Sequence, residues 1–192
     1  MNLNKLLFAA VIVLSANASF AQDTKIATHL VTISIPEIAL LDLEAPSTAI
    51  TLAGTAPTEA GLPMIFEDAY AKNATIWMNY SSIVKGTLSR KVTVAITDGA
   101  VPSGLKLTVL ASVASGDGAG SKGTASPALA LSGIQQDLVT GIGSTYTGDG
   151  ANKGRNLTYQ LGYATDEATD YTSLRFVDTA APLTITYTLS DI

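Results

Sequence analysis

The segment 183–190 constrains the fold of this chain more than any other. Its apolar residues Leu183, Ile185, Tyr187 and Leu189 alternate strictly with threonine or serine. Successive side chains of a β-strand point to opposite faces, so a period of two residues indicates a strand with one apolar and one hydroxylated face. An α-helix would scatter these apolar side chains around its circumference, and the segment therefore predicts a strand.

Other short apolar segments have the same character, being rich in Val, Ile, Leu, Thr and Tyr and bounded by Gly, Pro, Asp or Ser. The predicted strands are 28–35, 38–43, 48–53, 75–81, 91–97, 105–113, 128–131, 156–163, 173–177 and 183–190. Helical turns are expected only around 66–72 and 133–138, and the glycine-rich segments 115–123 and 141–154 are expected to be flexible hairpin loops. This pattern predicts an all-β protein, an Ig-like antiparallel β-sandwich of about 8–10 strands.

The first residues have the pattern of a secretory signal peptide. Lys5 precedes an apolar run at 6–14, and small residues follow at Ser19 and Ala21. The apolar run is far shorter than the ~20 residues of a membrane-spanning helix. We therefore expect cleavage after Ala21, a single sandwich domain at 22–192, and a secreted protein, either extracellular or at the cell surface. Retention in the periplasm stays open, because such a signal reports only export.

Composition excludes several classes of function. The chain has 11 Lys and Arg against 16 Asp and Glu, a formal net charge of −5, and no cysteine. A nucleic-acid partner is not expected, because binding to phosphates needs clustered basic side chains. The absence of cysteine removes thiol catalysis, thiolate metal sites and disulfides, so burial of the core must supply the stability.

No catalytic pattern stands out in the sequence. His29 is the one histidine, and no Gly-x-Ser-x-Gly motif accompanies it. Paired carboxylates could serve a glycosidase, but the acidic clusters also fit ordinary surface loops. These clusters are Glu59, Glu67 and Asp68, and Asp166, Glu167 and Asp170. We expect no enzyme and no cofactor.

A calcium site is a weaker alternative. Asp117, Asp149 and Asn152 lie in the glycine-rich segments, where backbone carbonyls could add ligands. The spacing does not match the recognised calcium loop, which alternates oxygen-bearing side chains and adds a bidentate glutamate. Plain turns are the preferred interpretation, and no metal is expected.

Trp77, the single tryptophan, has two interpretations. It could fill the core, which is the preferred prediction because buried aromatics commonly do so. It could instead face outward and stack on a sugar, together with Tyr80 or with loop tyrosines such as Tyr146 and Tyr163. The second interpretation makes the chain a secreted carbohydrate-binding module that recognises a glycan.

The segment 182–190 resembles the closing strand of bacterial fimbrial subunits of the chaperone-usher type. The layout as a whole, a signal peptide followed by a Thr-, Ala- and Gly-rich sandwich, is similar to small secreted fimbria-like or adhesin-like proteins of Gram-negative bacteria. The resemblance implies polymerisation by strand addition, in which an extended N-terminal segment of one subunit completes the sheet of the next. The implied donor is 25–35, with Val31, Ile33 and Ile35 as the inserted side chains.

The alternative is that this N-terminal segment is the first strand of its own sandwich. With either assignment, we expect an extracellular or surface structural protein, a fimbrial-type fibre subunit or adhesion module. Its expected partners are further copies of itself or other surface subunits. The carbohydrate-binding module is the second hypothesis.

Overall fold

The computed structural model describes residues 25–46, 49–176 and 182–192, and the predicted signal peptide lies outside these residues. The chain divides after Ile35 into the units Met1–Ile35 and Pro36–Ile192. The described part of the first unit, 25–35, contains no strand or helix. All of the regular structure described below belongs to the second unit.

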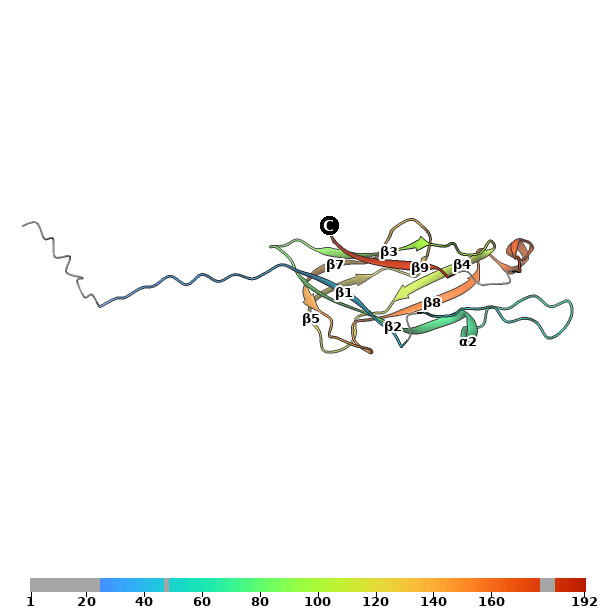
Figure 1. Cartoon of the computed structure of the whole chain (residues 1–192), viewed down its shortest axis with the longest axis horizontal. Helices are drawn as coiled ribbons and strands as arrows, with labels where there is room; N and C mark the ends of the chain where they lie inside the picture. The colour runs from blue at the N-terminus through green and yellow to red at the C-terminus, as the bar shows by residue number, and fades with distance from the viewer. Residues whose placement is uncertain (1–24, 47–48, 177–181) are drawn as a thin grey trace, which may run out of the picture. The chain divides into compact units, whose positions relative to one another are not determined.

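The described residues of the second unit form an antiparallel, sandwich-like all-β fold of nine strands, as the sequence predicts. The strands are β1 (Ile38–Glu44), β2 (Lys72–Ile83), β3 (Arg90–Asp98), β4 (Leu105–Ala111), β5 (Ala119–Ala125), β6 (Leu129–Ala130), β7 (Gln136–Tyr146), β8 (Arg155–Tyr163) and β9 (Thr184–Asp191). Three short helical turns accompany them: α2 (Asp68–Ala71), α3 (Glu167–Asp170) and a 3-10 turn at Tyr171–Ser173. Figure 1 shows β9 beside β3 and β8 beside β4.

The sheet runs β6-β4-β8-β2-β7-β3-β9, with β1 added to β2 and β5 added to β7. The long strand β2 connects the two halves of this order. Its first part, from Lys72 to Met78, pairs with β8, whereas Ser81 and Ser82 pair with β7. Because one strand belongs to both halves, the inner faces of β4 and β8 and of β3 and β7 meet around a single core.

The core consists mainly of aliphatic side chains from both halves, together with Tyr80 and Tyr159. Among the side chains that are fully buried are Met78, Val92, Leu138 and Leu157. Burial of each such side chain contributes about 1.5–3 kcal/mol. In a chain without disulfides, this burial is the main source of stability.

The structure corrects three predicted strands and adds two others. The segment 28–35 and the described parts of 48–53 and 173–177 contain no strand. In contrast, β5 and much of β7 occupy segments predicted to be loops, and β7 begins within the predicted helical turn at 133–138. The other predicted helical turn, at 66–72, corresponds to α2.

Glycine explains why β5 escaped prediction. Gly120 has a φ of +87°, and a Cβ at this position would lie 2.2 Å from the carbonyl oxygen of Ser144 on β7. Only glycine permits so close an approach of two strands in this conformation. The buried Arg155 supports the same strand, because its guanidinium donates hydrogen bonds to the carbonyls of Lys122 and Gly123. β5 therefore depends on backbone pairing and a neighbouring side chain more than on its own apolar residues.

Candidate functional site

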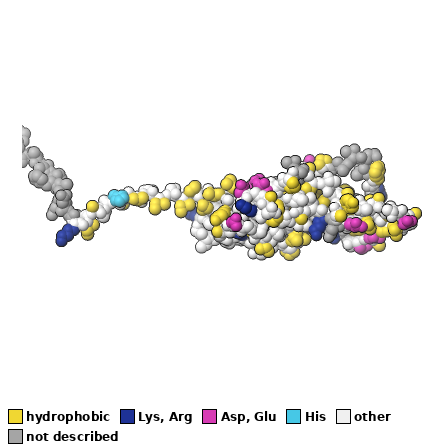
Figure 2. Space-filling view, turned by 90° about the horizontal axis from the view of Figure 1, so that it is seen from below, with side chains coloured by type: hydrophobic (Ala, Val, Ile, Leu, Met, Phe, Trp, Pro, Cys, Tyr) yellow, Lys and Arg dark blue, Asp and Glu magenta, His cyan; other side chains and the backbone are white. Residues whose placement is uncertain are grey.

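The extended segment 25–35 exposes an unusual amount of apolar surface. Its five large apolar side chains are 70–100% exposed: Ile26, Leu30, Val31, Ile33 and Ile35. Figure 2 shows apolar side chains recurring along this segment. The predicted donor residues are thus exposed and outside any strand, so the alternative that 28–35 forms the first strand of its own sandwich is wrong.

The strand β9 presents the predicted apolar face. Ile185, Tyr187 and Leu189 are half-buried against the core, while Thr184, Thr186 and Thr188 are exposed. Leu183, just before the strand, also packs against the core. In the described residues, β9 pairs along one side only, with β3, and no strand pairs with its other side. The backbone N–H and C=O groups along that open side can accept another strand.

Two tyrosines connect β9 to the core. The hydroxyl of Tyr187 is hydrogen-bonded to that of Tyr159 on β8. Burial raises the pKa of both tyrosines, and the neighbouring Tyr159 raises that of Tyr187 further. Both side chains therefore stay neutral in the folded protein at physiological pH.

Arg90 holds the edge strands together where they meet. Its side chain is buried, and it donates hydrogen bonds to groups at the ends of β1, β2 and β9. The acceptors are the carbonyls of Ile38 and Ile83, the Ser82 hydroxyl, and the carboxylates of Glu37 and Asp191. A buried guanidinium is tolerated here because several acceptors surround it.

Trp77 and Tyr80, two of the aromatic residues named in the sugar-binding hypothesis, lie in different environments. Tyr80 is buried, its hydroxyl donates to the Lys122 carbonyl (2.6 Å), and it accepts a hydrogen bond from Arg155 (2.9 Å). Burial raises its pKa. Tyr80 is thus a core residue that cannot stack on a ligand. Trp77 lies on the opposite face of β2 and is half-buried outside the core cluster, so the preferred prediction of a core tryptophan is wrong.

The outward face of β1 and β2 carries a cleft of about 450 Å³. Antiparallel pairing places Asp42 opposite Asn79 and Leu40 opposite Ser81. Further lining comes from β7 and the loop that follows it. The outward-facing residues of this surface, called the outer-face cleft below, are Leu40, Asp42, Asn79, Ser81, Tyr146 and Asp149.

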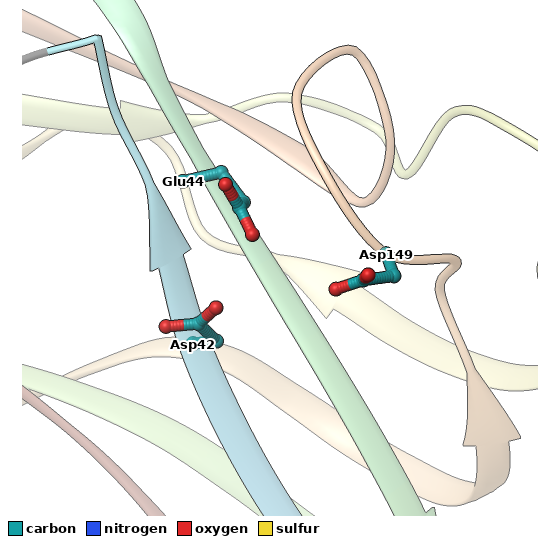
Figure 3. A group of neighbouring side chains, drawn as sticks. All are labelled: Asp42, Glu44 and Asp149. Carbon is teal, nitrogen blue, oxygen red and sulfur yellow. The ribbon is translucent and has the colours of Figure 1, made fainter.

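Three carboxylates gather at one end of the outer-face cleft. Asp42 and Glu44 project from β1, and Figure 3 shows Asp149 reaching toward them from its loop. Their oxygen atoms lie within 4.8 Å of one another. In the described residues, no salt bridge involves any of the three. Oxygen ligands of this type suit a hard cation such as Ca²⁺. The structure thus groups Asp149 with two β1 residues, not with the loop residues considered in the sequence.

Sequence reasoning missed Asp42 and Glu44. The available signal was their spacing, because two acids at alternate positions of a predicted strand must share a face. Their approach to Asp149, about a hundred residues away in sequence, depends on the tertiary fold.

The other acidic cluster has a structural role. Asp166 caps α3, and its carboxylate accepts hydrogen bonds from the backbone N–H and the hydroxyl of Thr169. These bonds lower the pKa of Asp166. The Asp170 carboxylate accepts from the backbone N–H groups of Thr165 and Asp166. Both groups are thus engaged in local backbone capping.

Comparison with known proteins returned no match to a family model, to a curated protein or to a solved structure. Among the described residues, no helix has the length and apolar character needed to cross a membrane.

Proposed function

We propose that this protein is an extracellular or surface structural protein, a fibre subunit or adhesion module without catalysis, whose copies join by strand addition. The observation that carries the proposal is the exposed apolar segment 25–35. Contiguous apolar surface on a soluble protein commonly marks an interaction site. Covering Val31, Ile33 and Ile35 would contribute about 1.5–3 kcal/mol for each side chain fully buried.

The open side of β9 is a suitable acceptor for this segment. From Val31 to Ile35 the donor alternates apolar and hydroxylated residues as β9 does, and 28–35 has the same length as β9. Added beside β9, the donor strand would place Val31, Ile33 and Ile35 against the half-buried core-facing side chains. Backbone hydrogen bonds would supply affinity, and the alternating side chains would set the register.

A donor and an acceptor on the same chain give a head-to-tail contact. Such a contact uses two different surfaces, so that each added copy presents a new donor or acceptor. Repetition produces a fibre when the rotation between copies does not close into a ring. A fibre subunit is therefore the assembly that this pair of surfaces supports best.

The test compares the protein with a variant lacking residues 22–35 by size-exclusion chromatography and negative-stain electron microscopy. Filaments or large oligomers should form with the segment and vanish without it. A matched pair of point variants sharpens the result: Ile33→Asp should abolish assembly, whereas Thr32→Asp, on the opposite face of the donor, should preserve it. Strictly monomeric protein at high concentration, with no polymer on the producing cells, would overturn the fibre proposal.

A further inference from the structure

The outer-face cleft is a second surface, separate from the strand-addition elements. On β2, Trp77, Asn79 and Ser81 face outward, whereas Met78 and Tyr80 face the core. The strands β1 and β7, which pair with β2, add further side chains to this outward face. Glu44 lies opposite Trp77, and Tyr146 pairs with Ser81.

Tyr146 stands between two hollows of this face. Its side chain is 53% exposed, and it lines both the outer-face cleft and a neighbouring hollow of about 370 Å³. Ser81 is also shared by both hollows, and the second adds Ser82, Ser144 and Thr145. The hydroxyls of Ser82 and Thr145 are buried and hydrogen-bonded within the protein, to Arg90 and to the Ala119 carbonyl, so the second hollow presents mainly apolar surface. An aromatic ring flanked by two hollows fits a ligand that extends past the ring on both sides.

A second aromatic side chain lies further along the same face. Trp77 and Ser81 are four residues apart on β2, which corresponds to about 13 Å at the usual rise of a strand. The carboxylates of Asp42 and Glu44 lie on β1 beside this stretch. The face thus offers two apolar aromatic platforms with hydrogen-bond acceptors between them.

The charge of the cleft restricts the ligand. Ionised carboxylates only accept hydrogen bonds, and three of them within 4.8 Å of one another repel an anion. A suitable ligand therefore has many donors, apolar C–H surface to cover an aromatic ring, and no negative charge. Oligosaccharides with neutral or amino sugars combine these properties.

The loop that carries Asp149 is held in place before any ligand binds. The backbone N–H of Tyr80 donates to the buried Thr147 hydroxyl (2.9 Å), and the Thr147 N–H donates to the Tyr80 carbonyl (3.1 Å). The Asn79 amide donates to the Gly150 carbonyl (3.0 Å). Asp149 is thus fixed on both sides, and a preorganised site loses less entropy on binding.

We propose that the outer-face cleft binds a neutral or amino-sugar oligosaccharide, with Tyr146 as the principal stacking residue and with Asp42 and Asp149 accepting hydrogen bonds from sugar hydroxyl or amino groups. This site goes beyond the fibre function and does not depend on it. The sugar-binding hypothesis from the sequence therefore moves from Tyr80 to Tyr146, on the outward face that also carries Trp77.

The test uses hexasaccharides of defined composition and the fluorescence of Trp77, the single tryptophan of the chain. The probes are cellohexaose, mannohexaose, N-acetylchitohexaose, its deacetylated form, and hexagalacturonate as the anionic comparison. At least one neutral or amino probe should change the Trp77 emission and bind in calorimetry, while hexagalacturonate should not. Tyr146→Ala and Asp149→Asn should each weaken binding roughly tenfold or more.

Tyr70→Ala is the matched control, because Tyr70 on α2 is 59% exposed and lies outside the cleft. Its affinity should equal that of the unmodified protein. Asp149→Asn preserves side-chain size, so it separates lost recognition from lost folding if Tyr146→Ala proves unstable. No binding of any neutral or amino probe at millimolar concentration would overturn the proposal, as would undiminished binding by both cleft variants. Stabilisation by Ca²⁺ alone, without any sugar response, would also overturn it in favour of a cation site.

Discussion

The segments 28–35 and 183–190 have nearly the same pattern and different environments. In 183–190 apolar residues alternate with Thr or Ser over all eight positions, and in 28–35 the same alternation runs from Val31 to Ile35. The second forms most of β9 and packs against the core, whereas the first forms no strand and leaves Ile33 83% exposed. Alternation therefore shows that a segment can form a β-strand with one apolar face. Whether the strand forms depends on an adjacent strand that can pair with it. The predictions below test this difference, from the largest expected effect to the smallest.

Deleting β9 should have the largest effect. Removal of residues 183–192 eliminates the pairing with β3 and uncovers the apolar core beneath it. The four half-buried apolar side chains and the eight backbone positions paired with β3 together contribute several kcal/mol to the free energy of unfolding. This contribution is comparable with the whole ~5–15 kcal/mol stability of a typical domain. We expect loss of the cooperative transition in circular dichroism melting. The comparison variant lacking 22–35 should melt within a few degrees of the intact protein; a large drop would show that the first segment also supports the fold.

Replacement of Arg90 should come next. Arg90→Ala leaves the Ser82 hydroxyl and the carbonyls of Ile38 and Ile83, at the ends of β1 and β2, without their donor. A buried polar group left without its partner typically costs about 1–3 kcal/mol, and two or three such groups add up to a large loss of stability. The carboxylates of Glu37 and Asp191 are mostly exposed, so their ion pairs with Arg90 add little. The neighbouring Lys91→Ala breaks only the partly exposed pair with Asp137 (2.8 Å) and should cost less than about 1 kcal/mol. Urea unfolding measures the loss of stability in both variants. Equal losses would contradict a stabilising role of Arg90 at the strand ends.

The same substitution in the two alternating segments isolates the difference between them. Ile185→Ala on β9 should lower the free energy of unfolding by about 2 kcal/mol, because Ile185 packs against the core. Ile33→Ala should change that of the monomer by less than about 0.5 kcal/mol. Denaturant titration measures both values, at a protein concentration too low for assembly. Similar losses would mean that the first segment is also packed.

Alkaline pH should produce the smallest effect. The folded state raises the pKa of Tyr187 and Tyr159, so folding favours their neutral forms. The corresponding stability is complete below about pH 10, the pKa of an unfolded tyrosine, and is lost as the pH rises through the folded pKa values. Melting temperature should therefore fall above pH 10. Tyr187→Phe should reduce this pH dependence, and an unchanged pH dependence would contradict the role of the buried tyrosine pair.

The fold class could be predicted from sequence because it depends on local alternation. β1, β3, β8 and β9 follow their predicted ranges to within a residue or two, since each carries apolar side chains at every second position. β5 and β7 could not be predicted in the same way. Gly120 and Gly141 indicate turns locally, and only pairing between the two strands makes extended structure favourable there.

The candidate sites also differ in how far their residues could be predicted from the sequence. The strand-addition residues were proposed from sequence, through the resemblance of 182–190 to the closing strand of fimbrial subunits, and the alternation of Val31, Ile33 and Ile35 placed the donor's apolar residues on one face. The cleft residues Asp42, Asp149 and Tyr146 come from segments far apart in the chain. The sequence pattern did not predict Asp42 and Glu44 as site residues, because their approach to Asp149 depends on strand register and on the tertiary fold.

By itself, the sequence determined an all-β fold, the absence of disulfides, and which residues of each alternating segment share a face. These properties depend on composition and on the two-residue period of a strand. The tertiary structure alone decided which segments find a partner, that Tyr80 faces the core while Trp77 does not, and that three acids meet on one surface. Register and long-range pairing control these outcomes, and a shift of a single residue would reverse every side chain of a strand.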